Sequence, residues 1–255
     1  MSVIDVTAAD RRVLLPGDTN YIGGASGATI TVWACWDGSN SSNTSGPQRF
    51  IEFSRELSDS QTALAFGKRI ISQGNGMSIS GRFRDADPFT TATFDFAPTP
   101  GICNHYAGVV DCVAETATLY VNGEFEQTVD YNPAGTNNNG TFQFASSRSA
   151  TLFGYFSNDQ SWRGNLEDLR LYRRVLSAAE IQDIYARRGM DSVRNDLRLQ
   201  FKFNEKAAGE VFTTGSIRDS SDFQTHSTTL RGVQDPIYRE ARSINDKRKA
   251  TRRVS

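Results

Sequence analysis

The chain has 255 residues, 38% of them hydrophobic and 22% charged, which is typical of a globular protein large enough to bury a substantial core. Its formal net charge of −1 gives no strong attraction to nucleic acid or to acidic membranes, so we expect neither as a partner. The first residues contain neither a signal-peptide core nor an apolar stretch long enough to span a membrane. We therefore expect synthesis in the cytoplasm.

Short segments rich in β-branched and aromatic residues recur between polar turns. They predict strands at residues 12–15, 30–36, 50–53, 62–66, 77–83, 91–96, 106–113, 118–121, 125–131, 141–144, 150–155, 166–172 and 197–203. Asn122-Gly123 predicts a hairpin turn, because a type I′ turn needs positive φ at both central residues. Many short strands and a single strong helix signal predict an all-β fold of two antiparallel sheets packed as a sandwich.

Alternation within the strands predicts which side chains share a face. In the strand at 166–172, one set contains Leu166, Asp168, Arg170 and Tyr172, and the other contains Glu167, Leu169 and Leu171. Glu167 and Asp168 then face opposite sides and cannot form a catalytic pair. By the same argument Trp33 and Trp36 lie on opposite faces.

The helix is predicted from its caps. Ser177 is suited to the N-cap position, and Glu180 three residues later completes a capping box. Leu176 and Ile181 occupy the positions of a hydrophobic staple. Gly189 can supply the left-handed residue that ends the helix.

Three parts of the sequence carry motifs of a known family. The first is the stretch at 162–181, which begins with Trp-Arg-Gly, contains Asp168, Arg170 and Tyr172, and ends with Leu-Ser-Ala-Ala-Glu-Ile. The second is the pair of strands at 105–109 and 118–124, and the third is the strand at 28–36. Together they resemble laminin-G-like, concanavalin A-like lectin domains, loosely over residues 13–238 and well over 106–189. The resemblance implies a jelly-roll sandwich with one short helix after the closing strand.

The chain length leaves room for one such domain, which we place at residues 1–238. Residues 190–238 are too few for a second domain, so we expect them to add strands to the same sandwich or to a neighbouring copy. Residues 239–255 contain seven basic and two acidic side chains and few apolar ones, which predicts a flexible basic arm.

Cysteine and histidine are scarce. The spacing of Cys35, Cys103 and Cys112 fits neither a metal site nor a disulfide framework, so we interpret them as reduced thiols, with a Cys103–Cys112 bridge as the alternative. The two histidines, His105 and His226, lie in no zinc or triad motif.

The acidic residues predict no catalysis. The Glu-x-Asp-x-x-Glu strand that supplies paired carboxylates to concanavalin-type glycoside hydrolases is absent. Glu52 and Glu56 could share a strand face, but surface ion pairing explains them better.

Calcium is the one cofactor that the resemblance suggests. The acids that match it are Asp168, Glu205 and Asp219, yet no compact acidic loop accompanies them. We therefore predict no cofactor, with a structural calcium ion as the alternative.

Recognition is the remaining class of function. Sugars stack on exposed aromatic rings, which makes Trp36, Trp162 and Tyr155 candidate contacts. The polar loops at 37–46 and 132–140 are surface connections, and the second adds Asn137 and Asn138.

We predict a non-catalytic recognition or assembly module, a lectin-like jelly roll on the surface of a larger assembly. One form is a virion structural or decoration protein that binds glycans or neighbouring subunits, with self-association left open. The alternative is a carbohydrate-binding lectin. A glycoside hydrolase is the third hypothesis.

Overall fold

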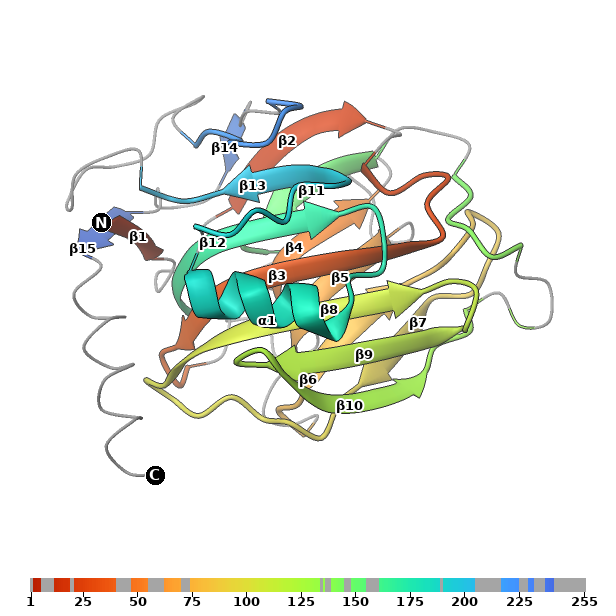
Figure 1. Ribbon diagram of the computed structural model, residues 1–255, viewed down its shortest axis with the longest axis horizontal. Coiled ribbons are helices and arrows are strands. Elements are labelled where there is room, and N and C mark those ends of the chain that lie inside the picture. Colours follow the sequence, from red (N-terminus) through yellow and green to blue (C-terminus); the bar gives the residue numbers. More distant parts are fainter. Residues whose placement is uncertain are drawn as a thin grey trace.

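The computed structural model describes residues 2–5, 12–18, 21–39, 47–54, 62–69, 74–133, 135, 139–144, 148–154, 161–188, 190–204, 217–224, 229–231 and 237–240. In these residues two antiparallel sheets lie face to face, and one helix, α1, lies across the outer side of the first sheet (Figure 1). The all-β sandwich with one short helix is confirmed. Within the same ranges, no helix has the length and apolar character needed to cross a membrane.

The first sheet, sheet A, has the strand order β10-β9-β8-β3-β12-β1-β15, and β13 also pairs with β12. Its strands are β1 (Ser2–Asp5), β3 (Gly27–Trp36), β8 (Cys103–Asp111), β9 (Thr116–Val121), β10 (Glu124–Asp130), β12 (Gly164–Tyr172), β13 (Leu197–Phe201) and β15 (Ile237–Glu240). Sheet B has the order β14-β2-β11-β4-β5-β6-β7. Its strands are β2 (Arg12–Asp18), β4 (Gln48–Ser54), β5 (Thr62–Lys68), β6 (Met77–Gly81), β7 (Thr90–Thr93), β11 (Arg148–Leu152) and β14 (Thr229–Arg231).

Some strands differ from the prediction. Instead of a strand at 141–144, Gln143 makes a single bridge with Arg84. Strands β1, β14 and β15 have only three or four residues, and pairing partners far away in the sequence define them, so no local pattern predicts them. β13, β14 and β15 all join the sheets of this sandwich. β15 spans the predicted boundary at residue 238, and 241–255 lie outside the described residues.

Aromatic rings link the two sheets through the core. The ring of Phe50 in β4 lies 4.5 Å from that of Trp162, 5.4 Å from that of Phe66 and 6.0 Å from that of Tyr106, measured between ring centres. Phe66 belongs to sheet B and Tyr106 to sheet A, so Phe50 packs against both layers. Such ring pairs add to the stabilisation that comes from burying apolar area.

The turn between β9 and β10 has the predicted geometry. Asn122 and Gly123 have φ values of 54° and 82°, so both central residues are left-handed. A side chain at Gly123 would collide with Gln182 and Tyr185 of α1, so the turn needs glycine for packing as well as for its backbone.

Helix α1 (Ala178–Arg187) begins as predicted. The Ser177 hydroxyl accepts a hydrogen bond from the Glu180 backbone N–H, and the Glu180 carboxylate accepts one from the Ser177 N–H. The end differs, because Arg188 is the left-handed capping residue with φ of 50°. Gly189, the predicted terminator, lies outside the described residues.

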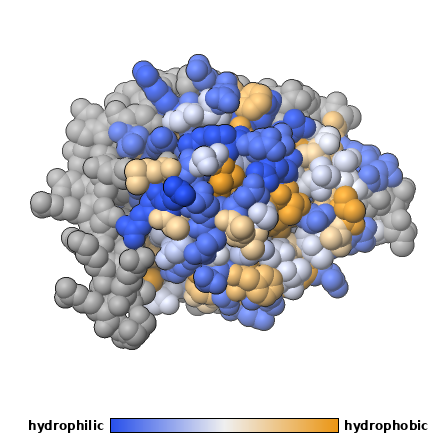
Figure 2. Space-filling model, in the orientation of Figure 1, coloured by the Kyte–Doolittle hydropathy of each residue, from blue (hydrophilic) through white to orange (hydrophobic). Residues whose placement is uncertain are grey.

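The helix packs on sheet A through its buried isoleucines. Ile181 and Ile184 form a second apolar cluster with Ala107 and Val109 of β8 and with Leu176. Figure 2 shows the surrounding surface as mainly hydrophilic, with hydrophobic residues in separate small areas. The apolar side of α1 is therefore turned towards the sheet.

A bulge in β12 changes the predicted alternation. The pairing of β12 with β3 shifts between Glu167 and Arg170, and Asp168 has φ of 48°. The extra residue moves Leu166 onto the core face that Leu169 and Leu171 share, so the prediction that Leu166 shares a face with Asp168 is wrong. Asp168, Arg170 and Tyr172 stay on one face.

Arg170 is the centre of a buried polar network on that face. Its Nε and Nη2 donate to the Asp168 carboxylate, and its Nη1 and Nη2 donate to Asp191 at 2.9 and 2.8 Å. The Tyr172 hydroxyl accepts from Nη1 at 3.1 Å and donates to the carbonyl of Val193. Burial opposes the charge on Arg170, but the two carboxylates outweigh it and raise the pKa of the guanidinium. The network therefore fixes the link after α1 to β12.

We expect Arg170→Leu to lower the free energy of unfolding by about 3–5 kcal/mol, because it leaves the buried carboxylates of Asp168 and Asp191 without a partner. Urea denaturation measures the loss. Arg187→Ala, which removes an exposed pair with Asp183, is the matched control and should not move the unfolding midpoint. Equal midpoints for the two variants would contradict the role given to Arg170.

We expect Ile181→Ala to lower the free energy of unfolding by about 2–5 kcal/mol through lost burial and a cavity beneath α1. The exposed neighbour Gln182 provides the control, since Gln182→Ala removes no buried side chain. A loss below about 1 kcal/mol for Ile181→Ala would show that α1 is peripheral to the fold.

Candidate functional site

Four connections meet at one end of the sandwich, which we call the disulfide end. Strand pairing brings them together, because Trp36 lies opposite Gly164, Cys35 opposite Cys103, and Lys68 opposite both Gln48 and Met77. The connections span residues 37–47, 69–76, 94–102 and 153–163, and parts of the first, second and last lie outside the described residues. Loops gathered at the end of a rigid sandwich are a common location for binding sites.

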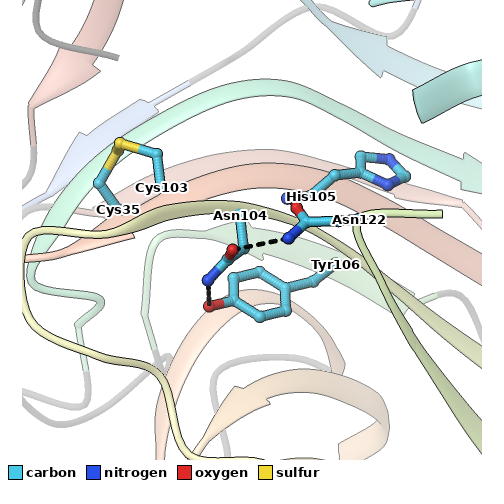
Figure 3. The surroundings of a disulfide bond; sticks show 6 residues. All are labelled: Cys35, Cys103, Asn104, His105, Tyr106 and Asn122. Atoms are coloured by element: carbon cyan, nitrogen blue, oxygen red, sulfur yellow. Dashed lines mark hydrogen bonds between the residues drawn. A yellow bond between two sulfur atoms is a disulfide. The ribbon is translucent and has the colours of Figure 1, made fainter. Parts of the chain in front are cut away.

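A disulfide between Cys35 in β3 and Cys103 in β8 joins the two strands at this end (Figure 3). The two residues are directly opposed, with Cα atoms 4.1 Å apart. The interpretation of these cysteines as reduced thiols is wrong, as is the alternative pairing of Cys103 with Cys112. The partners are 68 positions apart in the sequence, and only the strand register brings them into contact. Cys112 is a buried thiol, and burial raises its pKa.

Next to the disulfide, a ladder of side-chain amides continues along β8. The Asn122 amide nitrogen donates to the Asn104 side-chain oxygen at 2.9 Å, and the Asn104 amide nitrogen donates to the Tyr106 hydroxyl at 3.1 Å (Figure 3). Asn122 also accepts from the backbone N–H of His105. These bonds attach the β9–β10 turn to the strand that carries Cys103.

Trp36 contacts polar groups from neighbouring segments at the disulfide end. Its indole Nε1 donates to the carbonyl oxygen of Ser39 at 2.7 Å, and the Gln48 amide nitrogen donates to the same oxygen at 3.1 Å. The ammonium group of Lys68 lies 4.1 Å from the centre of the Trp36 ring. Asp37 and Ser39 form the exposed edge, where the Asp37 carboxylate accepts from the backbone N–H and the hydroxyl of Ser39. Strands β3, β4 and β5 thus each place a polar or aromatic side chain here.

Part of the hydrogen-bonding capacity of this cluster is unused. Lys68 is fully buried, yet its ammonium makes a single hydrogen bond in the described part of the chain, to the carbonyl of Arg69 at 2.8 Å. The side-chain oxygen of Gln48 is buried and accepts no hydrogen bond there. Burial lowers the pKa of Lys68 to about 8, although the charge of Asp37 acts in the opposite direction. Buried polar groups in this condition are candidates for contact with a ligand.

The structure separates the predicted contact residues. Trp36 and Trp162 belong to the disulfide end but are 3% and 0% exposed, so neither ring offers a face to a sugar, and this corrects their prediction as stacking contacts. Both residues belong to the main core cluster. Tyr155 belongs to the β11–β12 connection and lies outside the described residues.

Asn137 and Asn138 also lie outside the described residues, so their role stays a prediction. The described residues on either side of them belong to the other end of the sandwich. There the backbone N–H of Tyr131 donates to the carbonyl of Glu115, and the backbone N–H of Phe142 donates to the carbonyl of Ala25.

The acids that the sequence singles out are engaged by protein groups. Glu52 is fully buried, forms an ion pair with Arg49 at 2.6 Å and accepts from the Thr62 hydroxyl, so the prediction of a surface ion pair is wrong. Its predicted companion Glu56 lies outside the described residues. The carboxylate is therefore enclosed by protein rather than exposed at the surface.

The acids that match the family's calcium ligands have partners as well. Asp168 accepts from Arg170 and Gln200, and Asp219 accepts from the backbone N–H of Gln200 and from Ser221. Glu205 lies outside the described residues. Among the residues that the structure describes, no group of three or more His, Cys, Asp or Glu could hold a metal ion.

Sequence reasoning misses Lys68 and Gln48. The predicted strand at 62–66 ends too early, whereas β5 continues to Lys68. Extending the alternation from Leu64 through Phe66 places Lys68 on the core face, and this signal is present in the sequence. Gln48 needs the pairing of β4 with β5, which no local pattern provides.

The disulfide gives a direct test of this end. Thiol titration of the denatured, non-reduced protein should find one thiol per chain, that of Cys112, and finding three would show that the bridge does not form. Replacing Cys35 and Cys103 by serine should lower the free energy of unfolding by up to about 4 kcal/mol, because the bridge closes a loop of 68 residues. Cys112→Ala is the control that keeps the bridge and removes the remaining thiol.

Comparisons with known proteins complete the description. Residues 7–182 match the model of a family described as the concanavalin A-like lectin/glucanases superfamily, and no curated protein matches the chain. A putative carbohydrate binding protein from Bacteroides ovatus is similar, with 15% identity over 92% of this chain and a TM-score of 0.57, and the match spans 61% of that protein. A heptameric SAP-like pentraxin from Limulus polyphemus is similar over 74% of this chain and 83% of its own, with 14% identity and a TM-score of 0.51. At such identities the likeness shows a common fold.

Proposed function

Because the chain belongs to the concanavalin A-like lectin/glucanases superfamily, we propose that it is a non-catalytic recognition domain that binds a carbohydrate at the disulfide end. The observation that carries this proposal is the pair of buried groups with unused hydrogen-bonding capacity, the Lys68 ammonium and the Gln48 side-chain oxygen. A sugar hydroxyl can both accept from an ammonium and donate to an amide oxygen, so one polyhydroxyl ligand satisfies both groups.

The fold supports the same proposal. The similar structure from Bacteroides ovatus is named a putative carbohydrate binding protein, and its likeness to this chain extends over nearly the whole sandwich. The Cys35–Cys103 bridge holds β3 and β8 together directly beside Trp36, which limits movement of these two strands at the disulfide end. A site supported by a rigid sheet loses less entropy on binding than one built from loops.

The absence of catalysis is part of the proposal. Hydrolysis of a glycosidic bond needs two carboxyl groups on either side of the scissile bond. Glu52 is sequestered by Arg49 and Thr62, and Asp168 by Arg170 and Gln200, so neither is available as an acid or a nucleophile. The virion structural or decoration role has no support in the described residues or the comparisons, and self-association stays a prediction.

We expect the protein to bind a subset of glycans on an immobilised panel and to release no reducing ends from soluble polysaccharides. Gln48→Leu should weaken that binding, since it removes the amide without changing the size of the side chain greatly. Glu124→Gln, on the exposed edge strand β10, is the control and should bind as the wild type does. Release of reducing ends, or Gln48→Leu binding with unchanged affinity, would contradict the proposal.

A further inference from the structure

We propose that the ligand of the disulfide end is an acidic carbohydrate, such as a uronic acid oligomer, and that its carboxylate pairs with the Lys68 ammonium. This inference rests on the proposed function and names the class of ligand for the same site. It follows from a comparison of Lys68 with Arg170 and Arg49, two buried cations that have carboxylate partners.

The position of Lys68 is set by strand alternation. Leu64 and Phe66 of β5 point into the core, and Lys68 is the next residue on that face, where it meets the ring of Trp36. Register places Gln48 of β4 on one side of it and Met77 of β6 on the other. The ammonium is therefore held between the two sheets at their open end rather than on the surface.

Two other buried cations in the described residues, Arg170 and Arg49, have carboxylate partners. Arg170 pairs with Asp168 and Asp191, and Arg49 pairs with Glu52 at 2.6 Å. Within the same described residues, Lys68 has no carboxylate oxygen within 4.0 Å. Burying a charge without a counter-charge costs free energy, so a ligand that supplies a negative group would stabilise Lys68.

Asp37 does not take this role. It is the charged group that acts on Lys68, but its Oδ1 accepts two hydrogen bonds from Ser39 and its side chain lies in the exposed segment that follows β3. Among the described residues that pair with Lys68 or pack against its ammonium, Trp36 from β3, Gln48 from β4 and Met77 from β6 carry no charge.

The neighbouring amide suits a sugar rather than a simple anion. A uronic acid carries a carboxylate next to ring hydroxyls, so its carboxylate can accept from Lys68 while a hydroxyl donates to the unpartnered oxygen of Gln48. A neutral sugar would satisfy Gln48 but would leave the ammonium without a counter-charge. Because Lys68 is fully buried in the unliganded chain, the inference requires the disulfide end to open before a ligand can reach the ammonium.

The charge of Lys68 makes the binding dependent on pH. Its pKa in the protein is lowered by burial to about 8, and Asp37 only partly restores it. The ammonium is therefore present near pH 7 and is lost as the pH rises above about 8. Affinity for an acidic ligand should fall over that interval, whereas affinity for a neutral ligand should not.

The experiment compares a galacturonic acid oligomer with a galactose oligomer of the same length and linkage, using calorimetry. We expect the wild type to bind the acidic oligomer at least about tenfold more tightly at about pH 7, and to lose that preference at about pH 9.5. Lys68→Met should abolish the preference at both pH values, and Lys68→Arg should retain it at the higher pH because the guanidinium stays charged. Melting temperatures of both variants show whether they are folded.

A second measurement uses the unmodified protein, in case a variant fails to fold. Acylation of Lys68 by an amine-reactive reagent, followed by peptide mass spectrometry, should slow when the galacturonic acid oligomer is present and should be unaffected by the neutral oligomer. Equal affinity for the two oligomers, or acylation that neither oligomer changes, would overturn the inference. Binding of the neutral oligomer would then leave the proposed function intact, whereas failure of the wild type to bind any glycan on the panel would remove both.

Discussion

The guanidinium of Arg170 connects parts of the chain that would otherwise have little reason to lie together. It binds Asp168 at the bulge in its own strand and Asp191 in the link that follows α1. Asp168 also accepts from the side chain of Gln200 in β13, and the backbone of Gln200 donates to Asp219. One buried charge therefore organises the exit from the helix, the pairing of β13 with β12 and the segment around Asp219.

This arrangement explains the form of the closing strand. The bulge gives Asp168 a left-handed backbone, which turns its carboxylate to the same side as Arg170 while returning Leu169 and Leu171 to the core. Burial acts to raise the pKa of Asp191, but the hydrogen bonds and charge of Arg170 are stronger and lower it. Asp191 therefore stays ionised where it pairs with the guanidinium of Arg170. Asp168 and Asp219, which the family resemblance marks as candidate calcium ligands, serve as hydrogen-bond acceptors for the protein itself.

How far the sequence predicts the structure depends on the range of each interaction. The capping box of Ser177 and Glu180 and the turn at Asn122 and Gly123 are complete within a few residues, so their patterns predict them correctly. The Cys35–Cys103 bridge depends instead on the register of β3 with β8, and no local pattern contains that information. The face occupied by Leu166 depends on a bulge that only pairing with β3 reveals.

The candidate site shows the same limit, because residue type alone does not predict which side chains are enclosed by the core. The sequence marks Trp36 because an aromatic ring can bind a sugar, but it does not show that the ring is enclosed by the core. The groups with unused capacity, Lys68 and Gln48, lie at opposite ends of the β4–β5 segment of the chain and meet only through the pairing of these strands. Residue type marks Trp36 at the end of the sandwich where we propose the site, and strand register determines which side chains at that end have unused hydrogen-bonding capacity.

Lys68 also places stability and recognition in opposition. Its pKa falls from 10.5 to about 8 on folding, so between these values the unfolded chain binds more protons at this residue than the folded chain does. The folded state consequently gains stability as the pH rises through this window. At neutral pH it bears the full cost of burying an ammonium that has no carboxylate partner in the described part of the chain. An apolar residue at this position would remove that cost. A ligand carboxylate would remove it too, because it favours the charged form and draws the pKa of Lys68 back upwards. A buried charge that destabilises the unliganded protein gains most from an anionic ligand where the protein compensates that charge least. At the disulfide end this charge is the Lys68 ammonium next to the Trp36 ring.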